Sequence, residues 1–431
     1  MHPQFVPTAQ DRDSRTARHV LFISHDSNLH GAQTCLAELL RAIDRKRFRP
    51  FLISPAEGPL NDLVRRLGIP VAVRRLKPWA IPRLAANSHR AAILASVLSG
   101  LRDRVWAIAK QIEMHDIDVV YTNTVTILEG ALAARLMKRP HVWYLHEVLR
   151  GNKEIRGMLP QWIVNRVVRS LSTELIVNSR FNARIYGLDT NHGKGVLAYP
   201  GIDTDKFSPM HKSVPNPLDV YRDDKDTKLV GVLGALQPRK GHGNLIEAAY
   251  ILQRKLPNVR YLLTGVGYPE YLERLRKHVS ARGLSDQVVF LGWLDDHRSL
   301  LANVDLLVSA AQQESFGLTV AEAMASGTPV VATASGGPQE IIVDGVHGRL
   351  VPVDNPGALA NAMFSTLSNS DAMRSFAEAG FERVHSAFSL KSHVSAIERV
   401  LDRVANGATV DSRPSAPTRD HDACPNFPPN A

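Results

Sequence analysis

Cysteine and long apolar segments are what this sequence of 431 residues has least of. Its two cysteines, Cys35 and Cys424, provide no disulfide framework and do not pair as metal ligands. No stretch approaches the roughly 18 consecutive apolar residues that a membrane-spanning helix needs. The N-terminus also lacks the apolar core and the cleavage pattern of a secretion signal. These absences favour a protein of the reducing cytoplasm.

The charge balance is basic, with a net charge of +10. Much of the excess lies between Asp62 and Lys110, where Trp79 and Trp106 are also found. Cations beside aromatic residues suit an anionic membrane surface or a phosphorylated substrate, although an ordinary solvated face has the same composition. No helix-turn-helix, zinc-finger or aromatic RNA-binding motif accompanies the charge, so we expect no nucleic acid partner. The ten basic residues of this stretch are Arg65, Arg66, Arg74, Arg75, Lys77, Arg83, Arg90, Arg102, Arg104 and Lys110.

Short apolar strands alternate with helical patterns in two successive series. The first series begins with HVLFIS at 19–24 and the second with KLVGVLG at 228–234. Such alternation calls for parallel sheets covered by helices on both faces. The segment Ser208–Asp226, rich in proline and aspartate, is the natural linker. We therefore predict an α/β protein of two doubly wound domains that face a cleft, with the ligand at the carboxyl ends of both sheets.

The end of the chain has a helical pattern from Asp371 to Asn406. Its core candidates are Phe376, Phe381, Phe388, Val394 and Ile397. The tail after Gly407 carries proline, serine and charge without periodicity, and we predict that it is disordered. The predicted division is a first domain at 1–208, a linker at 209–226, a second domain at 227–386, a last helix at 387–406 and a tail at 407–431.

The stretch from Gln313 to Glu340 is the most informative part of the sequence. It is predicted to form a loop, a helix that begins after Gly317, a buried strand and a glycine turn. Glu314 and Glu322 would be about 80° apart on one continuous helix, at roughly 100° per residue. We therefore expect one in the loop and one on the helix, converging from two sides. Gly317 leaves the first helical amides uncovered, which suits a phosphate. The alternative is a surface helix with two solvated glutamates.

This stretch resembles the Glu-x7-Glu signature of retaining GT-B glycosyltransferases of family 4, and the resemblance extends from about His19 to the 390s. It implies two facing Rossmann-like domains and a last helix that crosses back to the first domain. It also implies that Glu314 contacts hydroxyls of a donor sugar and that Glu322 contacts the ribose of the nucleotide. The loop Phe316-Gly317 and the amides of Leu318 and Thr319 would then hold the diphosphate.

A second element, GALQPRKGHGNLIEA at 234–248, places cations between a glycine turn and a helix. Departure of a diphosphate builds negative charge, which either a metal or fixed cations can stabilise. By resemblance, Lys240 is the diphosphate lysine and no metal is used. The family often has an arginine where this chain has Ala235, and Arg239 is the candidate to replace it. The Asp295-Asp296 and Asp203–Asp205 pairs have plainer explanations as caps or turns, so we expect no essential metal and no cofactor.

Further donor-binding residues are implied by the same resemblance. Gly265 and Gly267 lie in TGVGYP, which resembles a third glycine loop near the nucleotide, and Leu291 lies in FLGWLDD, where the backbone would meet the base. His146 ends the strand HVWYLH and corresponds to a residue near the reacting carbon of the donor sugar. Gly31 corresponds to a small residue that lets donor and acceptor approach, next to His30 where the family commonly has a second glycine.

The resemblance implies a retaining, metal-independent hexosyltransferase. Its donor would be a UDP- or GDP-sugar, and its acceptor a glycan or a lipid-linked molecule of cell-envelope or exopolysaccharide synthesis. The expected location is the cytoplasm, or the inner face of the membrane as a peripheral protein. Two alternatives remain open: a nucleotide-sugar epimerase on the same fold, and a non-catalytic protein that binds membranes or nucleic acid.

Overall fold

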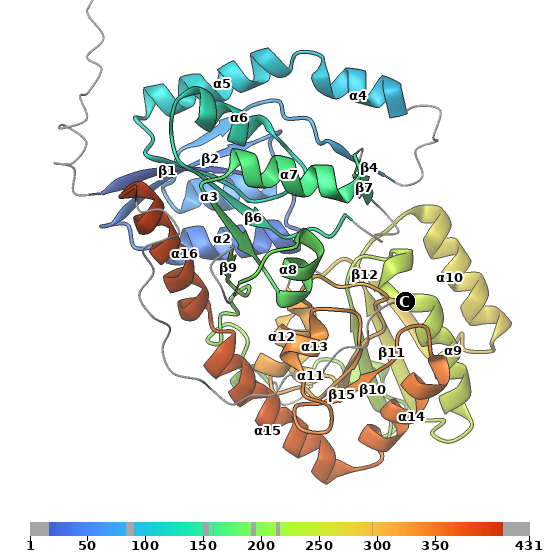
Figure 1. Ribbon diagram of the computed structural model, residues 1–431. Helices are drawn as coiled ribbons and strands as arrows, with labels where there is room; N and C mark the ends of the chain where they lie inside the picture. The colour runs from blue at the N-terminus through green and yellow to red at the C-terminus, as the bar shows by residue number, and fades with distance from the viewer. Residues whose placement is uncertain are drawn as a thin grey trace, which may run out of the picture.

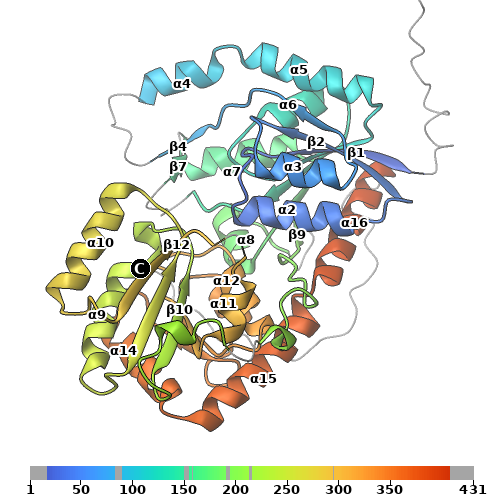
Figure 2. The same cartoon turned by 180° about the vertical axis from the view of Figure 1, so that it is seen from behind.

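The chain forms two parallel sheets, each with helices packed around it (Figures 1 and 2). The computed structural model describes residues 17–82, 90–149, 155–157, 159–190, 195–212, 216–294 and 296–407. The first sheet has seven strands: β1 (Arg18–Ile23), β2 (Phe48–Ser54), β3 (Val71–Val73), β5 (Val119–Thr122), β6 (His141–Leu145), β8 (Glu174–Val177) and β9 (Val196–Leu197). The second has six: β10 (Lys228–Leu233), β11 (Val259–Thr264), β12 (Val288–Gly292), β13 (Leu306–Ser309), β14 (Val330–Thr333) and β15 (Arg349–Val351).

Helices connect the strands in both halves. Those of the first half are α2 (Gly31–Ala42), α3 (Pro59–Arg66), α4 (Arg90–Leu98), α5 (Leu101–Met114), α6 (Glu129–Leu136), α7 (Gln161–Leu171) and α8 (Arg180–Tyr186). Those of the second are α9 (His242–Gln253), α10 (Pro269–Ala281), α11 (Arg298–Asn303), α12 (Leu318–Ala325), α13 (Pro338–Ile341), α14 (Pro356–Leu367) and α15 (Ser370–Ala387), followed by α16 (Leu390–Ala405). A short antiparallel ribbon pairs β4 (Ala80–Pro82) with β7 (Ile155–Gly157).

The strand order locates the ligand-binding edge of each sheet. It runs β3-β2-β1-β5-β6-β8-β9 in the first sheet and β12-β11-β10-β13-β14-β15 in the second. The direction of chain progression therefore reverses between β1 and β5, and again between β10 and β13. Open parallel sheets bind ligands at such switch points, beyond the carboxyl ends of the strands. The ligand site is therefore expected at the loops that follow β1, β5, β10 and β13.

The last helix returns to the first sheet, as the resemblance implied. α15 lies with the second half of the chain and α16 crosses to lie against α2 (Figure 1). Val394 and Ile397 are buried in one core with Val20 and Leu36 of the first half. Phe376 and Phe388 are buried as predicted, whereas Phe381 is only half-buried. The helical pattern is interrupted at Phe388 and Ser389, where the Ser389 hydroxyl caps α16 by accepting from the Ser392 amide.

The basic stretch between residues 62 and 110 is only partly a surface. Trp79 is 5% exposed, and its indole N–H donates to the Val125 carbonyl at 2.5 Å, so the expectation that it lies at a membrane interface is wrong. Arg104 is also buried and forms an ion pair with Glu129 at 2.7 Å. Both side chains were misread because the burial of a residue cannot be inferred from the charge of its neighbours in the sequence. Trp106, by contrast, is 46% exposed.

Several predictions fall on parts of the chain that the structure leaves undescribed. These are the tail from residue 408 onward, Cys424, Arg83, Asp295 and residues 213–215 of the predicted linker. Among the helices that are described, none combines the length and the apolar character needed to cross a membrane.

Candidate active site

Lys240, Arg239 and Glu314 meet at the switch point of the second sheet. The two cations lie on the short 3-10 helix Pro238–Lys240 after β10, and Glu314 lies in the loop after β13. Lys240 Nζ is 2.6 Å from Glu314 Oε2, and Arg239 Nη1 is 3.7 Å from the same oxygen. The side chains of Lys240 and Glu314 are each 17% exposed. Residues 74 positions apart in the sequence thus form one mostly buried cluster of charge.

Backbone packing fixes the turn that carries these cations. The Gln312 amide donates to the Arg239 carbonyl at 2.7 Å and so joins the turn to the loop after β13. Gly241 has a φ of +69°, and a Cβ at this position would lie 1.8 Å from the Ala310 carbonyl oxygen. Only glycine combines that left-handed conformation with so close an approach. The sequence Lys-Gly therefore positions Lys240 against the end of β13.

Gly265 and Gly267 support the same turn from the other side. A Cβ at Gly265 would lie 2.1 Å from the Gly234 carbonyl oxygen, and one at Gly267 would lie 1.9 Å from that of Leu236. The two glycines therefore let the loop after β11 press against the loop after β10. Leu291, on β12, is half-buried against a small core cluster. Direct contact of these three residues with a nucleotide stays a prediction.

The charge of Glu314 is set by its neighbours. Burial would raise the pKa of this carboxyl, but the charges of Lys240 and Arg239 and the hydrogen bond from Lys240 hold the pKa below its ordinary value. Glu314 is consequently a carboxylate at neutral pH and neutralises the adjacent lysine. A diphosphate that binds these cations has to compete with it.

The N-terminus of α12 lies in the loop that follows Glu314. Gly317 is the N-cap residue, with a φ of +105° and no side-chain cap. Among the described residues, the amides of Leu318 and Thr319 have no recorded acceptor, as expected for the first turn of a helix. The side chain of Phe316, in the same loop, is 3% exposed and packs in an aromatic cluster with Tyr199 and Phe388. Contact of Phe316 with the donor stays a prediction.

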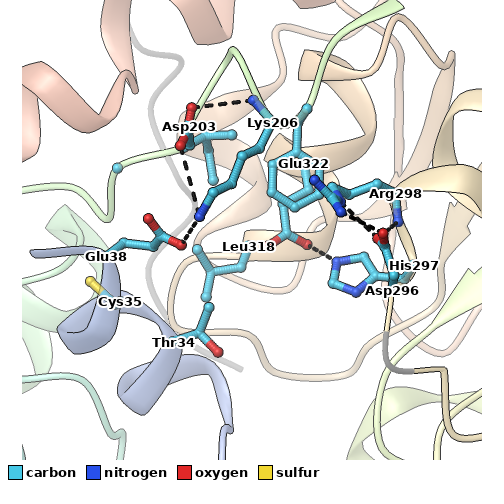
Figure 3. Close-up of a pocket in the computed structure, with 13 residues that line it drawn as sticks. Thr34, Cys35, Glu38, Asp203, Lys206, Asp296, His297, Arg298, Leu318 and Glu322 are labelled. Carbon is cyan, nitrogen blue, oxygen red and sulfur yellow. Dashed lines mark hydrogen bonds and ion pairs between the residues drawn. The ribbon is translucent and has the colours of Figure 1, made fainter. Parts of the chain in front are cut away.

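Glu322, on α12, has a different environment from Glu314. Its side chain is 8% exposed, and His297 Nε2 is 3.1 Å from its Oε2. It lines a cavity of about 280 Å³ between α2, the connector at 201–207, α11 and α12 (Figure 3). Both glutamates are thus mostly buried and paired, which contradicts the alternative of two solvated side chains. They lie in loop and helix as predicted, but each is held by its own basic partner.

His146 follows β6 and is buried, with 8% of its surface exposed. Its Nε2 is 3.1 Å from the Asn123 Oδ1, and its ring lies 4.0 Å from that of Tyr144. Burial, with smaller contributions from His393 and His25, lowers the pKa of His146 to about 3. His146 is therefore a neutral imidazole at physiological pH. It can exchange hydrogen bonds with a sugar but does not supply a positive charge.

Four buried histidines predict a loss of stability in mild acid. Burial lowers the pKa of His141 and His146 to about 3 and that of His242 and His393 to about 4, against about 6.5 in an unfolded chain. Because the folded pKa values are depressed, the unfolded chain binds more protons below pH 6.5, and stability falls as the pH drops. At pH 5 the loss is about 2 kcal/mol per histidine.

Urea unfolding followed by tryptophan fluorescence at pH 7.5, 6 and 5 measures this effect. The pKa of His297 is raised, so this histidine makes the folded state more stable as the pH falls. Its effect is outweighed by the four histidines whose pKa values are depressed. Carboxylates with depressed pKa values such as Glu314 titrate below this window. A free energy of unfolding that is constant between pH 7.5 and 5 would contradict the prediction.

Gly31 brings the two halves of the chain together. It is the first residue of α2, and a Cβ added to it would lie 3.3 Å from Leu318 Cδ1 on α12. A side chain here would therefore press on the residue that begins α12. The neighbouring His30 points outward: its side chain is 65% exposed and its Nε2 lies 3.5 Å from Asp26 Oδ2.

Two residues that hold parts of the candidate site in place were not identified from the sequence. His297 holds Glu322, and the only hint was its position between two charged residues after FLGWLD. Glu340, on α13, accepts from the amides of Arg180 and Phe181 at 2.9 and 2.8 Å, so a carboxylate of the second half caps α8 of the first.

The described residues contain no cluster of three or more His, Cys, Asp or Glu that could hold a metal ion.

Comparison with known proteins agrees with this fold. Residues 218–383 match the family profile described as Glycosyl transferases group 1, and residues 29–206 match Glycosyltransferase Family 4. The solved structure of HepE from Anabaena in complex with UDP-glucose superposes with a TM-score of 0.72 at 24% identity, over 89% of this chain and 99% of that one. The fold is the GT-B fold of glycosyltransferases. The chain belongs to family 4 of these enzymes, the group 1 glycosyl transferases.

Curated relatives match over a shorter length. The D-inositol 3-phosphate glycosyltransferase of Mycolicibacterium smegmatis is 35% identical over 237 residues, which are 52% of this chain and 51% of the relative. The lipopolysaccharide core biosynthesis glycosyltransferase LpsE of Rhizobium meliloti is 35% identical over 176 residues, 41% of this chain and 50% of the relative. The chain thus matches about half the length of these relatives.

Proposed function

We propose that this protein transfers a sugar from a nucleoside diphosphate sugar to a glycan or lipid-linked acceptor, with retention of anomeric configuration and without a metal. The observation that carries the proposal is the cluster of Lys240, Arg239 and Glu314 at the switch point between β10 and β13. Two cations and the amides that begin α12 supply the positive field that a departing diphosphate requires.

The proposed roles follow from where each side chain lies. Lys240 and Arg239 bind the diphosphate, together with the amides of Leu318 and Thr319. Glu314, released from Lys240, accepts hydrogen bonds from hydroxyls of the donor sugar. Glu322 binds the ribose in its mostly buried position beside His297.

The chemistry breaks the bond between the anomeric carbon and a diphosphate oxygen, and forms a bond from the acceptor oxygen on the same face. The proton of the acceptor hydroxyl passes to the departing phosphate oxygen, so no protonated histidine is needed. Neutral His146, at the carboxyl end of β6, is the proposed partner of the donor sugar from the first half of the chain.

The comparisons suggest which substrates to test first. HepE was solved with UDP-glucose, and the curated relatives are named for D-inositol 3-phosphate and for the lipopolysaccharide core. UDP-glucose is therefore the first donor to test, within a panel of UDP-, GDP- and ADP-sugars. Release of the nucleoside diphosphate identifies the donor, and NMR of the anomeric proton in the product reports retention. Absence of hydrolysis and of transfer with every donor would rule the proposal out.

We further propose that an exposed face of α4 and α5 binds an anionic membrane and so brings the site to a lipid-linked acceptor. Leu98 is 58% exposed and Trp106 46% exposed, and Arg102 and Lys110 are exposed on α5 beside them. Arg65 contributes little, because it is paired with Glu57 at 2.8 Å. At about 1 kcal/mol per basic residue, a few cations and an interfacial tryptophan give reversible attachment.

Flotation with vesicles tests this attachment. The wild type should float with vesicles that contain phosphatidylserine at low salt and should dissociate as salt is raised. The triple variant Arg102→Glu, Trp106→Ala and Lys110→Glu should remain in the soluble fraction. Lys277→Glu, at a lysine of α10 with a 76% exposed side chain, is the matched control and should float like wild type. A wild type that ignores anionic vesicles at low salt would exclude the membrane proposal.

A further inference from the structure

His297 and Glu322 form a pair on the wall of the cavity between the two halves of the chain (Figure 3). His297 Nε2 lies 3.1 Å from Glu322 Oε2, which is the distance of a direct hydrogen bond. The carboxylate is 8% exposed and the imidazole 35% exposed. The glutamate is therefore nearly enclosed, whereas the histidine remains open to solvent on one side.

The imidazole is itself held in place by neighbours. The ring of Phe207, in the connector, lies 5.7 Å from that of His297. Asp296 precedes it in the chain and forms an ion pair with Arg298 at 2.5 Å, while Lys206 of the connector pairs with Glu38 of α2 at 2.6 Å. The charged groups that line the cavity with His297 come from several elements. They are Asp296 just before α11, Arg298 at its start, Asp203 and Lys206 of the connector, Glu38 of α2 and Glu322 of α12.

A mostly buried carboxylate needs such a partner. Removing a carboxylate from water without an opposite charge is costly, and the group then either takes up a proton or turns toward solvent. Asp296, Lys206 and Glu38 are all engaged with other groups. His297 is the basic side chain whose contact with Glu322 the structure records. Within the part of the chain that the structure describes, this hydrogen bond to Oε2 is the one side-chain contact found for the Glu322 carboxylate, which leaves Oε1 available to a ligand.

We propose that His297 is a positioning residue: it holds the Glu322 carboxylate in the orientation that accepts hydrogen bonds from the two ribose hydroxyls. The affinity for the nucleotide then depends on the protonation of His297. The inference rests on the proposed function, because it assumes that Glu322 binds ribose. His297 acts through Glu322 and does not touch the nucleotide.

The direction of the pH dependence follows from the environment. Burial lowers the pKa of His297, but the hydrogen bond that its N–H donates to Glu322 and the charges of Glu322 and Asp296 outweigh this effect, and the pKa is raised above 6.5 in spite of Arg298. The imidazolium therefore persists to a higher pH than that of an ordinary histidine and is lost as the pH rises above that pKa. An ion pair between imidazolium and carboxylate is then replaced by a hydrogen bond from a neutral imidazole to the carboxylate, which is the weaker of the two.

The test is a titration of nucleoside diphosphate binding between pH 6 and pH 9 by calorimetry. UDP, GDP and ADP are compared first, and the tightest of them is used as the probe. For wild type we expect the dissociation constant to rise about tenfold across this range, because a neutral imidazole holds the carboxylate less firmly than an imidazolium does. His297→Gln keeps an N–H donor without a charge, so its affinity should be intermediate and lack this rise. His297→Ala should bind weakly at every pH.

Two controls separate positioning from other effects. His278→Gln, at a histidine of α10 that pairs with Glu247 at 2.5 Å, should keep the wild-type profile. The 2′,3′-dideoxy form of the probe lacks the hydroxyls that Glu322 would bind, so its affinity should show the same pH profile in wild type and His297→Gln. Ionisation of the diphosphate itself is common to all variants and cancels in the comparison.

The outcomes are distinguishable. A pH profile in His297→Gln that equals the wild-type profile would overturn the inference. So would a difference between the wild-type and His297→Gln profiles that persists with the dideoxy probe, because the effect would then not act through the ribose hydroxyls. Wild type that binds none of the three nucleotides would overturn the proposed function and the inference together. Recovery of the expected profiles would assign His297 its role.

Discussion

Replacing Lys240 by alanine should lower the turnover number about 100- to 1000-fold, the usual effect of removing one group that stabilises developing negative charge. Lys240 lies at the switch point of the second sheet, and the Lys-Gly turn holds it against the end of β13. In the proposed reaction, charge would accumulate on the diphosphate beside the Lys240 ammonium as the bond to the anomeric carbon breaks. Arg239, whose Nη1 lies 3.7 Å from the Glu314 oxygen that Lys240 contacts, retains part of the field. Steady-state kinetics with the donor identified by screening measures the effect.

The same measurement tests metal independence. If fixed cations carry the leaving-group charge, EDTA should leave wild-type turnover unchanged, and Mg²⁺ or Mn²⁺ should not restore Lys240→Ala. Lys240→Arg keeps the charge but changes its position, so it should recover only part of the activity. Lys277→Ala, at an exposed lysine of the same half of the chain, is the matched control and should behave as wild type. Complete inhibition by EDTA, reversed by a divalent cation, would show that a metal stabilises the leaving group.

The sequence predicted the architecture well because strand and helix patterns are local signals. Runs such as KLVGVLG and PVVAT are buried on both faces of a parallel sheet, and the structure places β10 and β14 within them. The glycine positions of the second half were informative for a related reason. A residue such as Gly241, with a left-handed φ and a carbonyl within 1.8 Å of its missing Cβ, tolerates no other side chain.

Side-chain partners were harder to predict, because they come from elements far apart in the sequence. Glu314 was identified, but its ion pair with Lys240 depends on the adjacency of β10 and β13. His297 was missed because Glu322, its partner, lies 25 residues away on another helix. Trp79 was assigned to the surface because its neighbours in the sequence are basic, although its own side chain fills the core.

Replacing Glu314 by glutamine should have opposite effects on binding and on turnover. In the structure the Glu314 carboxylate occupies Lys240 at 2.6 Å and lies 3.7 Å from Arg239, where it takes the place that a diphosphate would fill. Glutamine has the same shape without the charge. Removing this internal competitor should tighten binding of free nucleoside diphosphate about fivefold, close to 1 kcal/mol for one partly buried ionic contact. Turnover should fall about 100-fold, because the donor sugar loses a charged hydrogen-bond acceptor.

Glu322→Gln provides the comparison for this prediction. Loss of a charged acceptor for the ribose hydroxyls should weaken nucleoside diphosphate binding by about 1.5–3 kcal/mol, whereas Glu314→Gln should strengthen it. Calorimetry at two salt concentrations adds a second criterion. The gain in Glu314→Gln is electrostatic, so it should shrink at high salt. Equal weakening of diphosphate binding in both variants would show that Glu314 contacts the nucleotide directly and does not compete with it for Lys240.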